Sequence, residues 1–191
     1  MVNGIYHYLN EAWKHPDLTE QRKRIAEWRA SDAVVKVEKP LRLDKARMLG
    51  YKAKRGIMIA RVRVLRGGHK RPRPRKGRRS KRMTPRMTLR LNYRSICEQK
   101  AARKFTNKEV VNSYQVGVDG EYYFYEVIMA DRNAPEIKAD KQLSYLTKPA
   151  NANRAFKGLT SAGIKSRGLR NSSFKVPKVR PSLRAHGRRG N

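Results

Sequence analysis

Cysteine and histidine, the side chains most often used in metal binding and nucleophilic catalysis, are few in this chain and lie far apart. Cys97 is the only cysteine, so a disulfide within the chain and a cysteine-based zinc site are both excluded. The four histidines, at positions 7, 15, 69 and 186, have neither HxxxH nor HxxEH spacing. We expect Cys97 to be a buried, inert side chain on a helix, and only His69, in a strongly basic segment, to be a candidate binding residue.

Enzyme signatures are also missing from the sequence. It contains no phosphate loop of the GxxxxGKS/T kind and no Gly-rich dinucleotide fingerprint after a strand. Its carboxylates have the spacing of helix caps and surface pairs rather than of a convergent general acid and base. We therefore predict that the chain is not an enzyme, with no catalytic residue, metal, cofactor or small-molecule substrate.

Lysine and arginine are the residue types that carry chemistry here. The chain has 191 residues, with 47 Lys and Arg against 15 Asp and Glu, and a formal net charge of +32. Residues 45–97 contain 20 basic residues and no acidic one, and residues 141–191 contain 13 and none, whereas the other stretches are nearly neutral. Charge segregated in this way repels itself unless an anionic lattice is bound, and the phosphates of a nucleic acid supply one.

Among nucleic acids, RNA fits the sequence better than DNA. No zinc finger, leucine heptad or basic recognition helix occurs, and the cations lie on extended, Gly- and Pro-containing segments. In residues 45–97 Arg outnumbers Lys by 14 to 6, and guanidinium groups bridge phosphates and stack on exposed bases. Two alternatives stay open: a DNA-compacting chromatin protein, and an RNA-processing or RNA-modifying enzyme.

Apolar runs are short throughout the chain. The run over residues 127–130 is typical, and a membrane span needs about 20 apolar residues. Asn10, Glu11 and Lys14 interrupt the layout that a signal peptide would need. We expect a soluble, intracellular, cytoplasmic protein that has no membrane partner and is not a homo-oligomer.

Helical periodicity is strongest at the start of the sequence. Apolar residues recur at helical spacing over residues 5–13, and Pro16 ends that pattern. Asp17, with Glu20 three residues later, is typical of a helix N-cap. The sequence thus predicts two helices, the second with an apolar stripe formed by Leu18, Ile25 and Trp28.

A short helix and a strand are predicted next. Asp44 as N-cap and Gly50 as a C-terminal stop bracket a helix over residues 45–49. Residues 57–65 alternate with period two, which predicts a strand with an apolar face and an opposite face bearing Arg61 and Arg63. Residues 66–79 mix Arg with Pro and Gly, and we expect neither helix nor sheet there.

The middle of the chain predicts a helix and a hairpin. The helix covers residues 92–104, with Tyr93, Ile96, Cys97 and Ala101 facing inward. Asp119-Gly120 is a typical type I′ turn between two β-rich runs, and it predicts the pairs Val118–Glu121, Val116–Tyr123, Tyr114–Tyr125 and Val110–Met129. One face of this hairpin would form the best core surface: Val110, Tyr114, Val116, Tyr123, Tyr125, Val127 and Met129.

These elements predict an α+β fold, in which helices flank a small antiparallel sheet, with an internal basic loop and a long basic C-terminal extension. We divide the chain into N-terminal helices (1–44), a basic turn and strand (45–70), an extended basic loop (71–91), a helix and hairpin (92–140), and an extended basic tail (141–191).

Three long motifs also resemble a known family: LDKARMLGYKAKRGIMIARVRVLRGGHKRP (43–72), VVNSYQVGVDGEYYFYEVIMAD (110–131) and LTKPANANRAFKGLTSAGIKSRGLR (146–170). Together with the opening VNGIYHYLNEAW, they resemble the archaeal and eukaryotic large-subunit ribosomal proteins numbered fifteen, the e-type family absent from bacteria. The ending RAHGRRGN is closer to the archaeal branch.

The resemblance implies a structural constituent of the large ribosomal subunit, located on cytoplasmic ribosomes. Its partners would be 23S-type rRNA and neighbouring large-subunit proteins, and its function the stabilisation of folded rRNA during assembly and translation. The rRNA-binding residues that it implies are Lys45, Arg47, Lys52, Lys54, Arg55, Arg61, Arg63, Arg66, His69, Lys70, Arg71, Arg73, Arg75, Lys76, Arg78, Arg79, Lys81, Arg82, Lys148, Asn151, Arg154, Lys157, Thr160, Ser161, Lys165 and Arg167.

Overall fold

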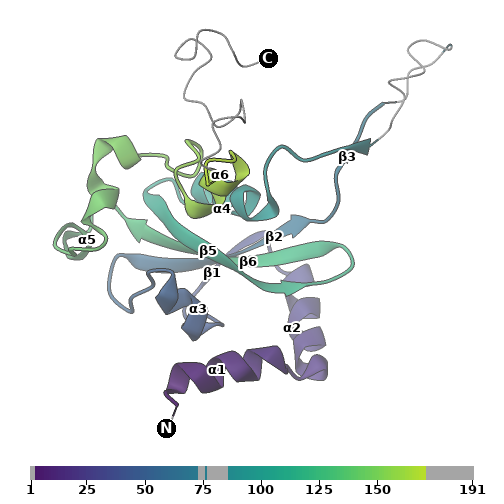
Figure 1. Cartoon of the computed structure of the whole chain (residues 1–191), viewed down its shortest axis with the longest axis horizontal. Helices are drawn as coiled ribbons and strands as arrows, with labels where there is room; N and C mark the ends of the chain where they lie inside the picture. The colour runs from purple at the N-terminus through teal and green to yellow at the C-terminus, as the bar shows by residue number, and fades with distance from the viewer. Residues whose placement is uncertain (1–2, 73–75, 77–85, 171–191) are drawn as a thin grey trace.

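A four-stranded antiparallel sheet with helices on both faces forms the centre of the molecule (Figure 1). The computed structural model describes residues 3–72, 76 and 86–170. The strand order is β1-β2-β6-β5, and the strands are β1 (Val34–Val37), β2 (Ile57–Leu65), β5 (Lys108–Val118) and β6 (Tyr122–Asp131). The α+β class with a small antiparallel sheet, predicted from the sequence, is confirmed.

Helix α4 (Tyr93–Lys104) covers one face of the sheet, which we call the α4 face. Its N-cap is Asn92, whose side chain accepts a hydrogen bond from the Ser95 N–H. Cys97 and Ala101 of the helix are fully buried against the alternating apolar positions of β2, as predicted: Met58, Ala60, Val62 and Val64. Burial raises the pKa of the Cys97 thiol, which keeps that group protonated and inert.

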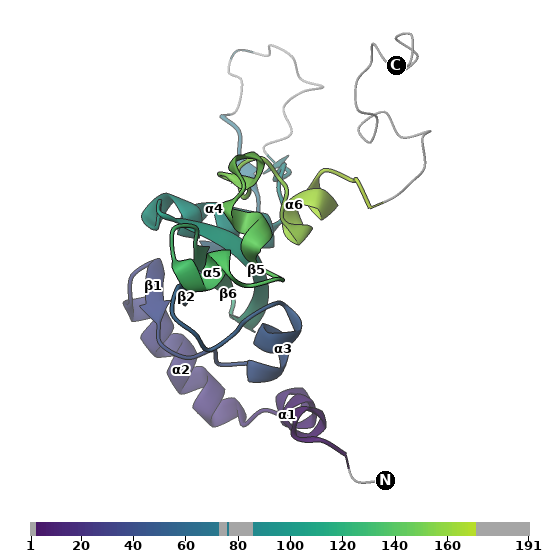
Figure 2. The same cartoon turned by 90° about the vertical axis from the view of Figure 1, so that its left-hand side faces the viewer.

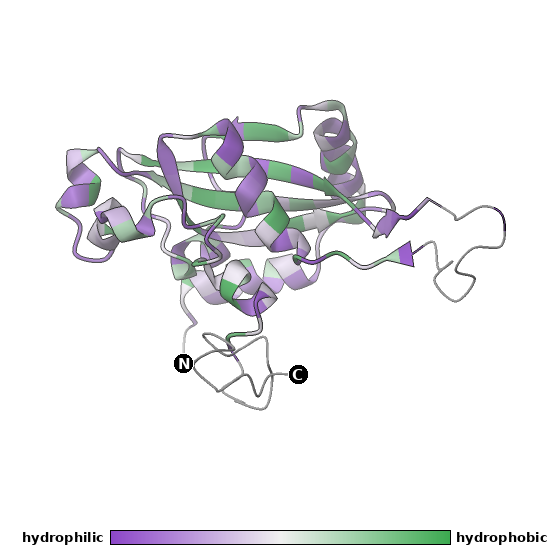
Figure 3. Cartoon of the chain, turned by 90° about the horizontal axis from the view of Figure 1, so that it is seen from above, coloured by the Kyte–Doolittle hydropathy of each residue, from purple (hydrophilic) through white to green (hydrophobic). Residues whose placement is uncertain are grey.

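The opposite face, which we call the α2 face, is also buried. It is covered by α2 (Leu18–Ala30), α3 (Leu43–Met48), α5 (Pro135–Lys138) and the 3-10 helix η2 (Ser144–Thr147). Both faces are therefore packed, and β6 is apolar at nearly every position rather than alternating. Seen from above, the hydrophobic residues concentrate in the strands (Figure 3).

The hairpin of β5 and β6 has a different register from the predicted one. The Asp119 carboxylate accepts hydrogen bonds from the N–H groups of Glu121 and Tyr122, so Asp119 caps the turn instead of forming its centre. The loop is therefore one residue later along the chain, and Val118 pairs with Tyr123. The predicted Val118–Glu121 pair is wrong for this reason.

Two β-bulges correct this offset along β5. Val111 and Val116 have no partner on β6, and each such extra residue shifts the register by one. Val110 therefore pairs with Met129 as predicted, whereas the Val116–Tyr123 and Tyr114–Tyr125 pairs are wrong. Because a one-residue shift turns side chains to the other side, Tyr114 and Val116 lie on the α2 face.

The N-terminal helices form where the sequence predicts them. They are α1 (Ile5–Lys14) and α2, with Asp17 as the N-cap of α2. The predicted stripe on α2 holds for Trp28, which is buried, but Leu18 is 62% exposed. The first helical residue of α3 is Leu43 rather than Lys45, and Asp44 lies within its first turn, buried beside Arg42, so its predicted role as N-cap is wrong.

The basic segment after β2 begins with ordered backbone. β3 (His69–Lys70) pairs with β4 (Arg86–Met87), so the prediction of no sheet over residues 66–79 is wrong at this point. This two-stranded ribbon, which we call the β3–β4 arm, projects away from the sheet (Figure 1). Of the predicted extended loop, residues 73–75 and 77–85 lie outside the described residues.

Residues 141–170 fold onto the sheet, contrary to the predicted extended tail. They form η2, the 3-10 helix η3 (Pro149–Asn151) and helix α6 (Ser161–Ser166). Leu143 and Leu146 are buried on the α2 face, and their burial offsets part of the cost of ordering this basic segment. Residues 171–191 lie outside the described part of the chain.

Candidate nucleic-acid interface

The predicted contact residues differ in how far they reach solvent. Those with exposed side chains are Arg47, Arg55, Arg66, His69, Lys70, Arg71, Lys76, Lys148, Lys157, Lys165 and Arg167. Those that are half-buried are Lys45, Lys52, Lys54, Arg61, Arg63, Asn151 and Ser161. Arg73, Arg75, Arg78, Arg79, Lys81 and Arg82 lie outside the described residues.

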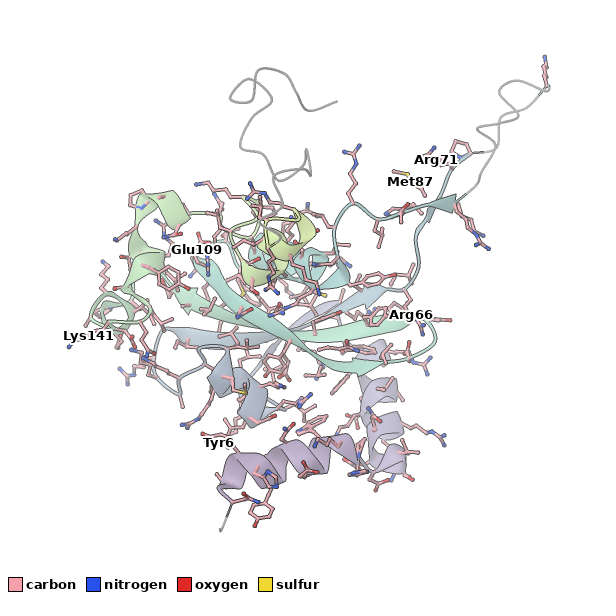
Figure 4. The ribbon with its side chains drawn as sticks, viewed as in Figure 1. Tyr6, Arg66, Arg71, Met87, Glu109 and Lys141 are labelled. Atoms are coloured by element: carbon pink, nitrogen blue, oxygen red, sulfur yellow. The ribbon has the colours of Figure 1, made fainter. Side chains whose placement is uncertain are left out.

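Two of the basic segments lie on the same side of the sheet. The β3–β4 arm, α4 and α6 lie on this side, and α1, α2 and α3 on the other, as two perpendicular views agree (Figures 1 and 2). Arg66 lies at the base of the arm and Arg71 further out (Figure 4). Residues 66–71 and residues 161–167 thus lie on the same side of the sheet, and α3, which carries Arg47, lies on the other side.

The Arg61 and Arg63 side chains are covered by protein. The Arg61 guanidinium lies over the Trp28 ring at 5.0 Å, and that of Arg63 over the Tyr122 ring at 5.3 Å. Arg63 also donates a hydrogen bond to the Arg29 carbonyl. Burial lowers the pKa of Arg61, and the charge of Glu126 opposes this effect. The polar face of β2 is thus largely occupied by α2 and β6 side chains.

Lys52 and Lys54 share one carboxylate. Their Nζ atoms lie 2.8 and 2.5 Å from Asp140 Oδ2, and Lys54 also donates to the Glu136 carbonyl. The Lys52 hydrogen bond, followed by that of Lys54, holds the pKa of Asp140 well below its usual range. These two lysines therefore fix residues 52–54 to the α5 segment, and part of their charge is neutralised within the protein.

Arg154 and Thr160 lie in the protein interior. Arg154 Nη1 donates to the carbonyls of Val110, at 2.7 Å, and Val111, at 3.2 Å. Thr160 Oγ1 donates to Glu98 and accepts from the Gly163 N–H at the start of α6. The family resemblance implied rRNA contacts for both residues, but the structure buries them and gives protein partners to the Arg154 Nη atoms and to the Thr160 hydroxyl.

Buried carboxylates attach the basic segments to the sheet. Glu98, fully buried on α4, accepts hydrogen bonds at 2.5 Å from Ser113 of β5 and from Thr160. Burial raises the pKa of Glu98, while its two hydroxyl donors oppose the shift. Glu109 of β5 accepts from the backbone N–H groups of Asn153 and Arg154. Together with Asp44 and Glu126, they are the four of the chain's 15 acidic residues that are buried within the described part of the chain, away from the exposed cations.

Three arginines of residues 45–97, on the same side as the arm, were not among the predicted contact residues. Arg86 and Arg90 are exposed and Arg94 is half-buried at the start of α4. They fall outside the family motifs, but all three belong to the acid-free stretch of residues 45–97. The absence of acidic residues was therefore the signal that could have identified them.

The described residues contain no group of three or more His, Cys, Asp or Glu side chains that could hold a metal ion. Within the same residues, no helix is both long and apolar enough to cross a membrane.

A family comparison identifies the chain. A family model described as Ribosomal L15, of the L15e type, matches residues 4–186. The chain belongs to the ribosomal L15e family. Two archaeal relatives named "Large ribosomal subunit protein eL15" are similar to it over nearly the whole length. The relative from Methanocella arvoryzae is 47% identical and covered over 100% of both chains, and that from Methanospirillum hungatei is 44% identical over 99% of both.

Membership of the L15e family makes the chain a ribosomal protein and confirms the resemblance stated from the sequence motifs. The family match includes residues 141–186, which contain the folded segment with η2, η3 and α6. The family match thus spans basic segments of the chain as well as the sheet.

Proposed function

We propose that this chain is a structural constituent of the large ribosomal subunit, which binds and stabilises folded 23S-type rRNA through Arg and Lys contacts with phosphates. The names of its two relatives support the assignment to the large subunit. The observation that carries the binding mechanism is the separation of charge: acid-free segments expose cations, whereas carboxylates such as Glu98 and Glu109 are buried. The protein would work on ribosomes in the cytoplasm, next to other large-subunit proteins.

The mechanism is electrostatic and needs no chemical step. Exposed guanidinium and ammonium groups neutralise phosphates where rRNA helices approach one another, and the released counterions favour association. The principal contacts are the exposed residues Arg47, Arg55, Arg66, His69, Lys70, Arg71, Lys76, Lys148, Lys157, Lys165 and Arg167. Arg61 and Arg63 contribute less, because aromatic rings and α2 cover their guanidinium groups.

A charge reversal on the β3–β4 arm tests this proposal. Lys70 and Arg71 are exposed at its outer part, so the double substitution Lys70→Glu and Arg71→Glu leaves the buried core unchanged. The matched control is Lys36→Glu with Lys39→Glu, two exposed lysines at or just after β1, in the nearly neutral part of the chain. Each tagged variant is expressed in cells, and its share in the large-subunit fraction is measured after a moderate-salt wash.

We expect the arm variant to be depleted from the large subunit and the control to co-sediment like the unchanged protein. Equal incorporation of both variants would contradict a role for the arm in rRNA binding. A free pool of unchanged protein, or preference for duplex DNA over structured RNA in a competition assay, would overturn the proposed function.

A further inference from the structure

A cleft of about 520 Å³ lies at the free edge of β5. In the strand order β1-β2-β6-β5, β5 is an edge strand, and its outer side is flanked by segments from both faces of the sheet. Leu49, after α3, lines it from the α2 face, and the first turn of α4 together with α6 lines it from the other. The volume falls within the range of sites that hold a small molecule, about 300–1,000 Å³.

Four cations from separate segments line this cleft: Lys45 of α3, Arg94 of α4, Lys165 of α6 and Arg170. No carboxylate is among the described residues that line it. Arg94 and Arg170 line the same cleft, and Glu98 Oε1 lies 4.0 Å from Arg94 Nε. Burial lowers the pKa of Arg94, the charge of Glu98 opposes this, and the charge of Arg170 lowers the pKa further. An anion bound beside them would relieve this repulsion.

Arg94 is held in place before any ligand arrives. Its Nε donates to Ser113 Oγ at 2.8 Å, and its Nη2 donates to Asn112 Oδ1. A guanidinium has five N–H groups, so hydrogen bonds to described residues leave part of its donor capacity available. Because its orientation is already fixed, little side-chain entropy is lost when an anion binds.

Aromatic and amide groups complete the cleft. Tyr93, Tyr114 and Tyr125 line it, and Gln115 presents an exposed carboxamide from the edge of β5. Burial raises the pKa of Tyr125 to about 12, so its hydroxyl stays neutral and adds no negative charge. Aromatic rings and amides are the groups with which proteins hold an unstacked RNA base.

The geometry of the edge argues against a peptide strand as the occupant. β5 is interrupted by bulges at Val111 and Val116, one of them next to Gln115. Bulges twist an edge strand and break the regular row of N–H and C=O groups that an added strand needs. The four cations also favour a polyanion over a peptide backbone.

We propose that this cleft binds one unpaired nucleotide of folded RNA, with its phosphate beside Arg94 and Arg170 and its base against Tyr93 and Gln115. The inference rests on the proposed function, since it assumes that RNA is the partner. It adds a site that recognises a nucleotide extruded from a helix, whereas the arm contacts phosphates of any sequence.

The test compares two RNA hairpins that differ only in one unpaired adenosine. Binding of the full-length protein to each hairpin is measured by fluorescence anisotropy at a fixed salt concentration. Since stacking of a base is worth about one power of ten in affinity, we expect roughly tenfold tighter binding of the hairpin with the unpaired nucleotide. Gln115→Glu, which adds a carboxylate to the cleft, should abolish this preference, and so should Lys165→Glu.

Matched controls carry the same changes elsewhere. Gln142→Glu and Lys36→Glu alter exposed side chains outside the cleft, and both should keep the preference. If the unchanged protein binds the two hairpins equally, the nucleotide site is excluded, while the proposed function stands. If it binds neither hairpin nor rRNA, the proposed function itself fails.

Crosslinking gives a second readout that does not depend on the variants. A 4-thiouridine at the unpaired position should crosslink to peptides that contain Tyr93 or Gln115, and crosslinks confined to the β3–β4 arm would overturn the proposal. Hydrogen exchange gives a third: protection of the β5 edge by a large-subunit protein, without protection by rRNA, would show that a peptide occupies the cleft instead.

Discussion

Buried carboxylates in this protein bind segments of its own chain. Glu126, 2% exposed on β6, accepts hydrogen bonds from the Tyr114 hydroxyl and from the backbone N–H of Leu41. Glu98 likewise accepts hydrogen bonds from the hydroxyl groups of Ser113 and Thr160. Burial raises the pKa of both carboxyls, although their hydrogen bonds oppose it. In a chain of such positive charge, each acidic residue that is buried inside the fold leaves one negative charge fewer on the proposed RNA-binding surface.

We predict that Glu98→Ala lowers the free energy of unfolding by about 1–3 kcal/mol, because two buried hydroxyl groups lose their acceptor. Glu98→Gln should cost less, since the amide keeps the shape and one acceptor oxygen. The free energy of unfolding is measured by urea denaturation of each purified variant. An alanine variant as stable as the glutamine one would contradict a hydrogen-bonding role for Glu98.

The pH dependence of the same variants tests the raised pKa. A carboxyl whose pKa is higher in the folded state contributes stability that is fully present below its unfolded pKa and is lost as pH rises through the folded value. Acidification from neutral pH toward the unfolded pKa of Glu, about 4.3, should therefore stabilise the unchanged protein relative to Glu98→Gln. If the difference in free energy of unfolding between the unchanged protein and Glu98→Gln does not vary with pH, the raised pKa of Glu98 is contradicted.

Arg154 holds the first bulge of β5. Its Nη1 atom donates to the carbonyl groups of Val110 and of the bulged Val111, and its guanidinium lies 5.2 Å from the Tyr145 ring. We predict that Arg154→Lys lowers the free energy of unfolding by about 1–3 kcal/mol, because an ammonium cannot reproduce the planar fork. The matched control, Arg167→Lys at an exposed position, should change it by less than about 0.5 kcal/mol in the same urea titration.

At the level of elements, the contact between α6 and the preceding turn positions the cationic end of the β5 cleft. Gly163 of α6 packs against the backbone of Gly158, and a Cβ on Gly163 would lie 2.6 Å from the Gly158 Cα atom. The Gly158 backbone cannot move aside for this Cβ atom as easily as the end of a flexible side chain could. The spacing between α6 and the Gly158 turn, and with it the place of Lys165, depends on the absence of a methyl group at Gly163.

We predict that Gly163→Ala destabilises the protein by about 1–3 kcal/mol through this overlap, even though alanine favours helix by about 1 kcal/mol. Gly120→Ala is the control, since a Cβ there meets no atom within 4 Å. Thermal unfolding of both variants, followed by circular dichroism, checks the difference. A Gly163→Ala variant more stable than the Gly120→Ala one would show that α6 can move aside.

At the level of the whole molecule, charge is divided between two sides of one sheet. The β3–β4 arm, α4 and α6 lie on one side and the N-terminal helices on the other (Figures 1 and 2). Residues 1–44 are nearly neutral, and α1 exposes apolar side chains there, with Ile5 70% exposed. Long-range attraction to a polyanion is therefore weakest at α1 and α2, which favours an approach with other parts of the molecule facing the polyanion.

The proposed contacts with phosphates predict that the affinity for rRNA depends on salt concentration. If about eight phosphates are neutralised, the logarithm of the rRNA affinity should fall with the logarithm of salt concentration with a slope of about −6 to −7. Each lost phosphate contact reduces the slope by about 0.7–0.9, so Lys70→Glu with Arg71→Glu should flatten it by nearly two. Filter binding to large-subunit rRNA fragments at several salt concentrations measures both slopes, and an affinity that does not vary with salt would exclude the electrostatic mechanism.

The sequence by itself determined the class of fold, the existence of nearly every long element and the class of partner. Local signals suffice for these properties: Asp17 and Asn92 cap helices through their own side chains, residues 57–65 alternate with period two, and acid-free stretches are visible in any count. The family motifs then indicated the ribosome, which the family match confirmed.

Only the tertiary structure decided which of the basic residues are free. Arg154 bonds the carbonyls at the first bulge of β5, and the two bulges turn Tyr114 and Val116 to the α2 face. Burial of Arg154 and the sharing of Asp140 by two lysines depend on contacts between residues far apart in sequence. A cation looks the same in a sequence whether it meets a carboxylate, an aromatic ring or solvent, because its neighbours come from other parts of the chain.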